Sequence, residues 1–355
     1  MTDPAFPSEA SADLPGVAFG PMRQVLLHQV SEHGLTLRED APGRLTVETS
    51  HGLIGLRAGD HRAVAGHVAA RDSRDLFVMK SAVVEQLRTV FPDAAEAMRW
   101  SDVAGDPVEP PNFQRTRVLS VARLGRSFLR MRLQAVDLSA YDDASIHFRF
   151  VLPPPGVAPE WPTVAPNGST RWPAGPAAPH KPVYTVRHAD VATATLEVDI
   201  FEHDGGRATD WARGIMAGTD DRRIVGMVGP GGGGLVDAQT TLIATDETGF
   251  PAAARIVEGL PEGARAEVIL ESGHGTACDY PFAGRAGVHI RWLDRSRGDS
   301  LRDAALAALS RHPDSVIWFA GERDAARDIR AAARAAGLGP KTLRISGFWS
   351  SAAGG

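Results

Sequence analysis

The side chains that suggest chemistry most directly lie in the segment Pro182-Val183-Tyr184-Thr185-Val186-Arg187. Alternate residues of a β-strand share a face, so this segment would point Thr185 and Arg187 to one side and Tyr184 to the other. A hydroxyl can hydrogen-bond a flavin ring, an arginine can bind a phosphate through two N–H groups, and an aromatic ring can lie against the isoalloxazine. The pattern therefore suits a flavin nucleotide, although six residues alone are a weak signal.

Two further segments offer places for phosphate and nucleotide groups. Gly205 and Gly206 let the backbone approach a ligand, and a helix starting near Ala208 presents free N–H groups to a pyrophosphate. Asp246 and Thr248 follow a buried strand and open a helix, which is where open α/β sheets bind ligands. Either residue can instead be a helix N-cap, and the two roles are compatible.

Composition limits the class of protein. The chain has 355 residues, 43% hydrophobic and 23% charged, as in soluble globular proteins with two or three domains. The net charge of −5 gives no reason to expect a nucleic-acid partner, and arginines far outnumber the lysines Lys80, Lys181 and Lys341. A lone cysteine, Cys278, excludes an internal disulfide and a cysteine-ligated cluster. No apolar run is close in length to the about 20 residues that a membrane-spanning helix needs. We therefore expect a cytoplasmic protein.

The elements that must position these motifs begin with a small N-terminal region. Residues 1–19 are rich in Pro, Ser, Ala and Asp and predict a loose leader. Residues 20–105 predict a compact α+β domain with strands at 45–49, 52–56 and 75–79, and a helix capped by Ser81. The proline-rich segment 106–111 predicts a stiff linker at a domain boundary.

Residues 112–230 and 236–355 show two different patterns. Alternating hydrophobicity at 118–124, 127–133 and 145–152 predicts an antiparallel β-barrel interrupted by a proline-rich loop at 153–182. We interpret the glycine run 231–234, together with Gly229 and Pro230, as a hinge and not as a nucleotide cradle, because no Gly-Lys-Ser/Thr follows. After this run, strands alternate with helices. That alternation predicts a parallel sheet flanked by helices. A barrel followed by a parallel α/β domain is a two-domain electron-transfer arrangement.

With these motifs together, the chain resembles the siderophore-interacting proteins, a group of flavin reductases in the ferredoxin-reductase superfamily, from about Asn112 to Trp349. The family's flavin motif Arg-x-Tyr-Thr-x-Arg matches residues 182–187, with Pro182 in place of the leading arginine. The family's segments Gly-Asp-Glu-Thr-Ala-Leu-Pro-Ala, Trp-Ala-Ala-Gly-Glu and Gly-Tyr-Trp-Arg are similar to residues 245–252, 318–322 and 347–349, although the last lacks the arginine. Residues 52–102 resemble, more loosely, a small domain of unknown role found fused to, or beside, these reductases.

The resemblance implies the residues of the cofactor sites. For FAD they are Tyr184, Thr185, Arg187, Asp199, His203, Arg207, Ala208, Thr209 and Trp211. For NADPH or NADH they are Asp246, Thr248, Arg295, Gly321, Glu322 and Trp349. Core packing is an equal alternative for Trp211, and a solvated arginine is the commoner alternative for Arg295. For Trp349, stacking near the flavin and packing on the sheet are both open. Arg149 and Arg171 are candidate docking groups for an anionic substrate, and no protein metal site is expected.

The resemblance implies a reductase that uses FAD and NAD(P)H to reduce Fe(III) held by a siderophore, releasing iron in the cytoplasm. Siderophore oxygens are hard ligands suited to Fe(III), so reduction weakens chelation. One alternative is a general NAD(P)H-dependent flavin or quinone reductase. Another is a flavin- or siderophore-binding protein without turnover, for which Pro182 is the motive. The sequence does not define the siderophore, the nicotinamide cofactor or the oligomeric state.

Overall fold

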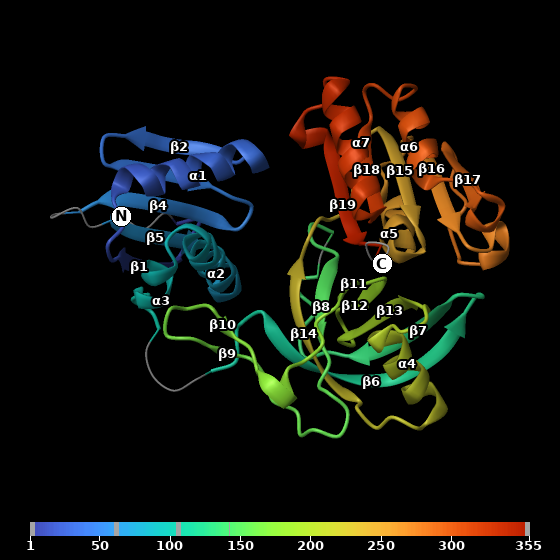
Figure 1. The fold of residues 1–355 in the computed structure, drawn as a ribbon, viewed down its shortest axis with the longest axis horizontal. Helices are drawn as coiled ribbons and strands as arrows, with labels where there is room; N and C mark the ends of the chain where they lie inside the picture. The colour runs from blue at the N-terminus through green and yellow to red at the C-terminus, as the bar shows by residue number, and fades with distance from the viewer. Residues whose placement is uncertain (1–3, 60–63, 104–107, 142, 352–355) are drawn as a thin grey trace. The chain divides into compact units, whose positions relative to one another are not determined.

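The computed structural model describes residues 4–59, 64–103, 108–141 and 143–351, and it divides into two compact units (Figure 1). One unit spans residues 1–113 with 156–179, and the other spans 114–155 with 180–355. The loop 156–179, predicted within the flavin domain, therefore belongs to the first unit, where Asn167 Nδ2 donates to Ala95 O at 2.9 Å. The predicted linker lies partly in 104–107, outside the described residues, so the boundary there stays a prediction.

The first unit is built on an antiparallel sheet with strand order β1-β5-β4-β3-β2. The strands are β1 (Ser8–Leu14), β2 (Thr36–Ala41), β3 (Arg44–Glu48), β4 (Gly52–Ala58) and β5 (Val64–Ala70). The helices are α1 (Phe19–His33), α2 (Ser73–Val90) and α3 (Pro92–Ala97). The core lies between the helices and the sheet face that carries Leu14, Leu45 and Val68. The loop 156–179 adds the short hairpin of β9 (Thr163–Val164) and β10 (Thr170–Arg171).

Two predictions for this unit are wrong. Residues 8–14, within the expected loose leader, form β1, because Ala10, Ala12 and Leu14 alternate into the core and pair the strand with β5. The expected strand 75–79 is the first half of α2, which begins where the Asp72 side chain accepts from Asp75 N at 2.8 Å. The short apolar run is compatible with the period of a strand or of a helix, and the cap at Asp72, nine residues before the expected cap at Ser81, decides for the helix.

The second unit begins with an antiparallel sheet in the order β11-β8-β14-β6-β7-β13-β12. Its strands are β6 (Phe113–Leu124), β7 (Phe128–Gln134), β8 (His147–Val151), β11 (Val183–Thr185), β12 (His188–Asp190), β13 (Thr195–Phe201) and β14 (Ile224–Gly231), with helix α4 (Arg207–Ala217) after β13. Val186 N donates to Ile146 O and Arg187 N to Glu197 O, both at 2.8 Å, so the link between β11 and β12 joins the two edges of the sheet. The sheet thereby closes on itself as a barrel.

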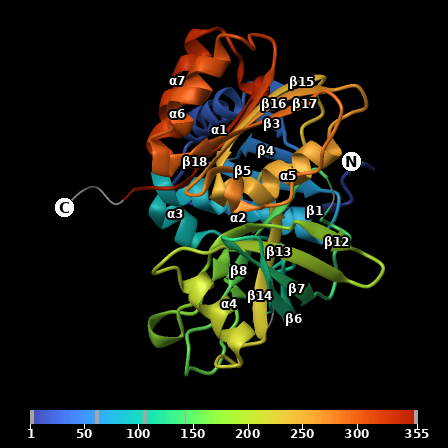
Figure 2. The same cartoon turned by 90° about the vertical axis from the view of Figure 1, so that its right-hand side faces the viewer.

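The chain then forms a parallel sheet in the order β17-β16-β15-β18-β19. Its elements are β15 (Thr240–Asp246), α5 (Phe250–Gly259), β16 (Arg265–Ser272), β17 (Val288–Asp294), α6 (Leu301–Leu309), β18 (Val316–Glu322), α7 (Arg323–Ala335) and β19 (Leu343–Trp349). Helices α6 and α7 cover one face and α5 the other (Figure 1, Figure 2). The predicted fold class, a barrel followed by an α/β parallel sheet, is confirmed.

The barrel and the parallel sheet share a hydrophobic core. Phe128 of β7 packs with its ring centroid 4.5 Å from Tyr280 and 5.9 Å from Phe250 of α5. The glycine run is part of the same packing and not a hinge. Residues 231–235 hydrogen-bond to residues 143–147, and a Cβ at Gly232 would lie 2.8 Å from His147 Cδ2. The two halves of this unit therefore hold any site between them in place.

Candidate functional site

A cavity of about 500 Å³ lies between the barrel and the carboxyl edge of the parallel sheet. The barrel lines it with Phe128, His147, Pro182, Val183, Tyr184, Thr185, Asp199, Phe201 and His203, and the parallel-sheet half with Glu247, Thr248, Pro251, Ser346, Gly347, Phe348 and Trp349. Residues predicted for FAD and residues predicted for NAD(P)H thus meet in one space. The carboxyl ends of parallel strands are where such sheets bind ligands.

The flavin motif is placed by the short edge strand β11. Thr185 is buried opposite His147 of β8, and its Oγ1 lies 3.2 Å from His147 Nδ1. The Tyr184 ring packs 5.4 Å from that of Phe150. The strand ends at Thr185, and the next two residues cross to the other edge of the barrel. The expectation that Thr185 and Arg187 share a strand face is therefore wrong.

Arg187 does not line the cavity. Its guanidinium forms two hydrogen bonds with the Glu258 carboxylate of α5, one of them 2.8 Å from Nη1 to Oε2. Its Nε is buried and has no partner among the described residues. The contact ties the barrel to the parallel-sheet half. A role for Arg187 toward the FAD phosphate stays a prediction.

Asp199 of β13 is a buried charge in the cavity wall. Its carboxylate accepts from Arg130 Nε at 2.7 Å, from Arg130 Nη2 at 2.9 Å, and from the Tyr280 hydroxyl at 2.6 Å. Burial, with the charge of Asp199, raises the pKa of Tyr280 well above its usual value, so this phenol stays a donor. The sequence motif predicted Asp199, but Arg130 and Tyr280 were missed because they lie far from it in the chain.

Helix α4 supplies the predicted phosphate end. Gly206 is its N-cap, no side chain caps it, and a Cβ there would lie 2.7 Å from the His203 ring. The first turn contains Arg207, which is exposed, and Ala208 and Thr209, which are buried. Trp211 lies deeper, 2% exposed, with its Nε1 donating to Arg222 O at 3.1 Å. Trp211 is therefore part of the barrel core and does not line the cavity.

Basic side chains gather near this helix end and beside Pro182. Arg149 is exposed, and its Nη1 donates to Lys181 O at 2.8 Å. Burial and the Arg149 charge lower the pKa of Lys181, and burial and the Arg207 charge lower the pKa of His180. These basic side chains lie close together where the family motif has an arginine. Arg171, on β10, lies in the first unit.

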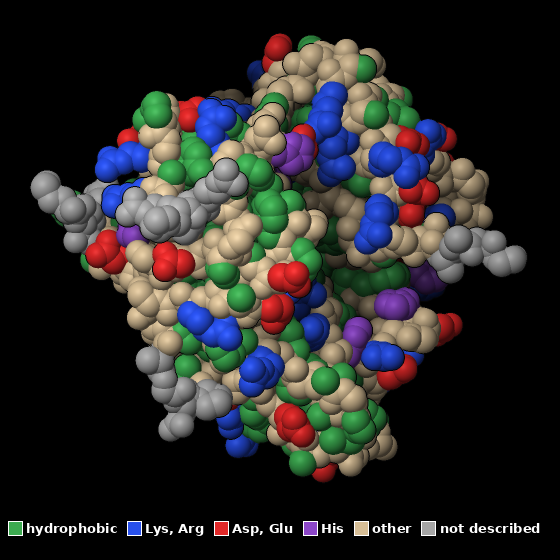
Figure 3. Space-filling model, turned by 60° about the vertical axis from the view of Figure 1, so that its left-hand side comes forward, with side chains coloured by type: hydrophobic (Ala, Val, Ile, Leu, Met, Phe, Trp, Pro, Cys, Tyr) green, Lys and Arg blue, Asp and Glu red, His purple; other side chains and the backbone are tan. Residues whose placement is uncertain are grey.

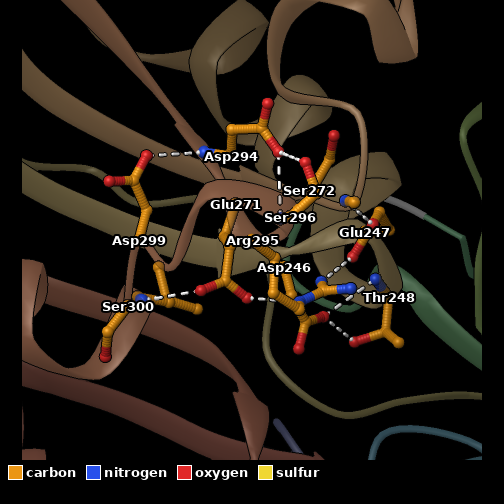
Figure 4. Close-up of polar contacts among 12 residues, drawn as sticks. Asp246, Glu247, Thr248, Glu271, Ser272, Asp294, Arg295, Ser296, Asp299 and Ser300 are labelled. Carbon is orange, nitrogen blue, oxygen red and sulfur yellow. Dashed lines mark hydrogen bonds and ion pairs between the residues drawn. The ribbon is translucent and has the colours of Figure 1, made fainter.

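The parallel-sheet side centres on Asp246 at the end of β15 (Figure 4). Asp246 Oδ1 accepts from Thr248 N at 2.9 Å and from Thr248 Oγ1 at 2.5 Å, and its Oδ2 accepts from Trp349 Nε1 at 2.7 Å. Asp246 thus serves as the cap that we considered for it. Burial raises its pKa. Trp349 is 41% exposed and lines the cavity.

Gly321 and Glu322 end the neighbouring strand β18. A Cβ at Gly321 would lie 3.1 Å from Asp246 Oδ2, so glycine allows the two strand ends to approach. Glu322 is the N-cap of α7 and accepts from Asp324 N at 2.6 Å and Ala325 N at 3.0 Å. Glu322 has a structural role, and a contact with the nicotinamide stays a prediction.

Arg295 is held between two buried carboxylates (Figure 4). Its Nη2 pairs with Glu247, and its Nε donates to Glu271 Oε2 at 2.9 Å, while Glu271 Oε1 accepts from Leu301 N at 2.7 Å. Burial opposes the charge of Arg295, but the two carboxylates outweigh it and raise its pKa. Arg295 is thus paired with two carboxylates while its side chain remains 45% exposed, and its role toward NAD(P)H stays a prediction.

His147 was missed by the sequence motifs. It lines the cavity beside Thr185 and meets the Phe348 ring edge-on at 6.0 Å. Burial, and then the Arg255 charge, lower its pKa from 6.5 to about 4, so the imidazole is neutral at physiological pH. The one sequence signal for it is indirect, because Gly232 is required where its ring packs.

On the face drawn in Figure 3, Lys and Arg side chains lie among Asp and Glu side chains. Among the described residues no helix is long and apolar enough to cross a membrane.

Comparison with known proteins identifies the second unit. A model of the siderophore-interacting FAD-binding domain matches residues 117–234, and a model of siderophore-interacting protein matches residues 238–352. The NADPH-dependent ferric-chelate reductase of Escherichia coli K12 is 30% identical over 67% of this chain and 92% of its own length. The chain belongs to the siderophore-interacting protein family. The predicted resemblance is confirmed.

Two further members of the comparison agree with this assignment. Ferric acinetobactin reductase of Acinetobacter baumannii is 27% identical over 47% of this chain and 59% of its own length. The crystal structure of a siderophore-interacting protein from Aeromonas hydrophila has a TM-score of 0.54 and 20% identity, and the match covers 68% of this chain and 99% of that one. The latter shows the shared fold.

The cavity fits the FAD that this family's domain binds. The Gly206 N-cap leaves the first N–H groups of α4 without a capping side chain, and a Cβ there would collide with His203. Tyr184 and Thr185 line the cavity together with His203, the residue against which Gly206 packs. An aromatic ring, a hydroxyl and a helix N-terminus are together the groups that a flavin nucleotide requires.

Proposed function

We propose that this protein is a cytoplasmic FAD-dependent reductase that uses NADPH or NADH to reduce Fe(III) in a ferric siderophore. The observation that carries the proposal is the single cavity that combines Tyr184 and Thr185 with Thr248 and Trp349. A hydride donor and its acceptor must lie in contact, and one cavity lined by both motifs satisfies that need. Relatives named as ferric-chelate and ferric acinetobactin reductases support the substrate class.

In this proposal Tyr184 and Thr185 hold the flavin ring, and His147 orients the Thr185 hydroxyl. A bound FAD would accept a hydride from the nicotinamide and pass electrons to Fe(III). The first turn of α4 and Arg207 would bind the pyrophosphate. Lys181, next to Pro182, would supply the cation that the family motif places at residue 182.

The remaining predicted residues either form the edge of the cavity or are candidate docking groups for the substrate. Asp246, through Thr248 and Trp349, fixes the edge of the cavity against which the nicotinamide would lie. Arg149 is exposed near Lys181 and suits docking of an anionic ferric siderophore. Arg171 stays a candidate of the same kind on the first unit.

The cofactor part of the proposal is tested by flavin affinity. We expect the purified protein to bind FAD more tightly than riboflavin, and Arg207→Ala and Lys181→Ala each to weaken FAD about 10-fold (about 1.4 kcal/mol). Riboflavin affinity should not change, since it has no phosphate. Arg291→Ala is a matched control, because Arg291 is exposed in the parallel-sheet half and has no ion-pair partner among the described residues. Equal affinity for FAD and riboflavin would contradict the phosphate assignment.

The reaction is tested under anaerobic conditions. NADPH or NADH should bleach the flavin band of the FAD-loaded protein, and a ferric siderophore should restore it with formation of Fe(II) that an added Fe(II) chelator traps. Bleaching followed by reoxidation with quinones but not with ferric chelates would favour a general reductase. Absence of bleaching with both nicotinamides would favour a binding protein.

A further inference from the structure

The loop 156–179 joins the flavin motif to the first unit. It connects β8 with β11, the strand of the flavin motif, yet it packs as part of the first unit. The chain leaves the second unit after Pro155 and returns at His180, just before β11 begins. The family model of the FAD-binding domain spans residues 117–234 and includes the loop, but neither family model includes residues 1–113, which complete the first unit.

The two ends of the loop are fixed to the barrel next to the flavin motif. Leu152 and His180 exchange two backbone hydrogen bonds of 2.9 Å, and Phe150 N donates to Pro182 O at 2.9 Å. Strand β11 is three residues long and pairs with β8 alone. Because so short an edge strand has few bonds of its own, its position depends on what restrains the loop that leads into it.

The tip of the loop is docked on α3 and on the core of the first unit. Asn167 is 4% exposed, and its Nδ2 donates to Ala95 O of α3 at 2.9 Å. Its Oδ1 accepts from Ser169 N at 3.1 Å and from Ser169 Oγ at 2.7 Å, so the side chain amide is fully used. Gly168 has a φ of +78°, and a Cβ there would lie 2.6 Å from Trp100 Cδ1. The tip therefore packs too closely on the core to accept a larger residue.

The loop is held by the first unit on the side that leads from β8 to the tip as well. The Trp161 ring lies 5.7 Å from the Phe113 ring, and Val164 N donates to Val108 O at 2.9 Å. The partners Phe113 and Val108 belong to the first unit. The loop is thus anchored at several points between its two fixed ends.

Docking of the tip shortens the free chain next to the flavin motif. The entropic cost of closing a loop grows with its length as (3/2)RT ln n, so an undocked connection between β8 and β11 restrains β11 less than a docked one. We propose that the N-terminal unit is a positioning domain, which through the loop 156–179 holds β11, with Tyr184 and Thr185, in the arrangement that receives FAD. The inference rests on the proposed function, since it takes FAD as the ligand of this motif. Such coupling is reciprocal, so bound FAD also stabilises the first unit.

The first test is FAD titration of the full chain. Gly168→Ala drives a Cβ into the Trp100 ring and undocks the tip, so FAD affinity should fall about 3- to 10-fold, as expected when a long connection loses its restraint. Gly175→Ala is the matched control. Gly175 lies in the same loop with a φ of +60°, but a Cβ there would meet nothing within 4 Å, so the variant has the backbone strain without the collision. It should leave FAD affinity unchanged.

A second variant removes the docking bond without adding volume. Asn167→Asp keeps the acceptor for Ser169 and places a carboxylate oxygen against Ala95 O, so FAD affinity should again fall about 3- to 10-fold. Hydrogen exchange read by mass spectrometry tests the reciprocal effect. FAD should slow amide exchange in residues 92–97 of the unmodified protein but not of Gly168→Ala, and slow exchange in α2 shows that the first unit of each variant remains folded.

The outcomes separate this inference from the proposed function. A protein that binds no FAD would refute the proposed function. A protein that binds FAD with the same affinity in Gly168→Ala, Asn167→Asp and Gly175→Ala would overturn the positioning role alone. Exchange in residues 92–97 that does not respond to FAD in the unmodified protein would overturn it as well.

Discussion

The contact between Tyr280 and Asp199 joins the two halves of the second unit, and removing one oxygen tests its value. Tyr280→Phe keeps the ring that packs 4.5 Å from Phe128 and deletes the hydroxyl 2.6 Å from Asp199 Oδ2. Asp199 is 2% exposed, so water does not replace the lost donor. A hydrogen bond to a charged group contributes about 1.5–3 kcal/mol. We expect that loss in the free energy of unfolding, and a fall of about 3–12 °C in Tm for a unit of this size.

The assay is a double-mutant cycle read by urea denaturation and tryptophan fluorescence. Asp199→Asn removes the charge, and Arg130 keeps only its ion pair with Glu197, 3.2 Å from Nη1 to Oε2, so the substitution should cost about 1.5–3 kcal/mol. If the hydroxyl acts through Asp199, then Tyr280→Phe added to Asp199→Asn should cost less than about 1 kcal/mol more. A loss below about 0.5 kcal/mol for Tyr280→Phe alone, or the same loss in both backgrounds, would refute the reasoning.

Three further predictions follow from single contacts. Gly232→Ala should destabilise the protein by about 1–3 kcal/mol in urea unfolding, because its φ is +73° and the Cβ would meet the His147 ring, whereas Gly231→Ala, with open space around it, should be nearly neutral. The pKa of His147, about 4 in the fold against 6.5 unfolded, means that the unfolded chain binds the extra proton. Unfolding free energy should therefore fall by up to about 3 kcal/mol from pH 7 to pH 4, and His147→Gln should reduce that slope. Arg295→Gln should lower stability by about 2–4 kcal/mol and raise the KM values for NADPH and NADH alike, while an effect confined to NADPH would assign Arg295 to the 2′-phosphate.

Much of the second unit could be predicted from sequence because its signals are local. Alternating hydrophobicity identifies the strands of the barrel, and the alternation of strands and helices identifies the parallel sheet. The position of Asp246 and Thr248 at the end of a strand follows from the local sequence alone. Contacts that join distant segments could not be predicted. Arg187 pairs with Glu258, and Trp349 reaches Asp246, only because the fold brings them together.

In the first unit the local sequence of two segments is compatible with two structures each, and contacts outside the segment select one of them. Residues 8–14 have the composition of a disordered leader, and small alanines make their alternation easy to overlook. Residues 75–79 have too few positions to separate a period of 2 from one of 3.6. Pairing with β5 makes residues 8–14 a strand, and the Asp72 cap makes residues 75–79 part of a helix.

Because the glycine run 231–234 is held by hydrogen bonds, ligands do not reach the cavity through a hinge opening at this run. If residues 231–234 were a hinge, the two halves of the second unit could open about it. Instead the run is hydrogen-bonded along residues 143–147, and Arg187–Glu258 and Tyr280–Asp199 fasten the halves beside it. Phe348 and Trp349, at the end of β19, are 40% and 41% exposed and line the cavity. We therefore predict that exchange of nicotinamide and substrate moves this short C-terminal aromatic segment, and that Trp349 fluorescence reports the movement, since its Nε1 must release Asp246 when it moves.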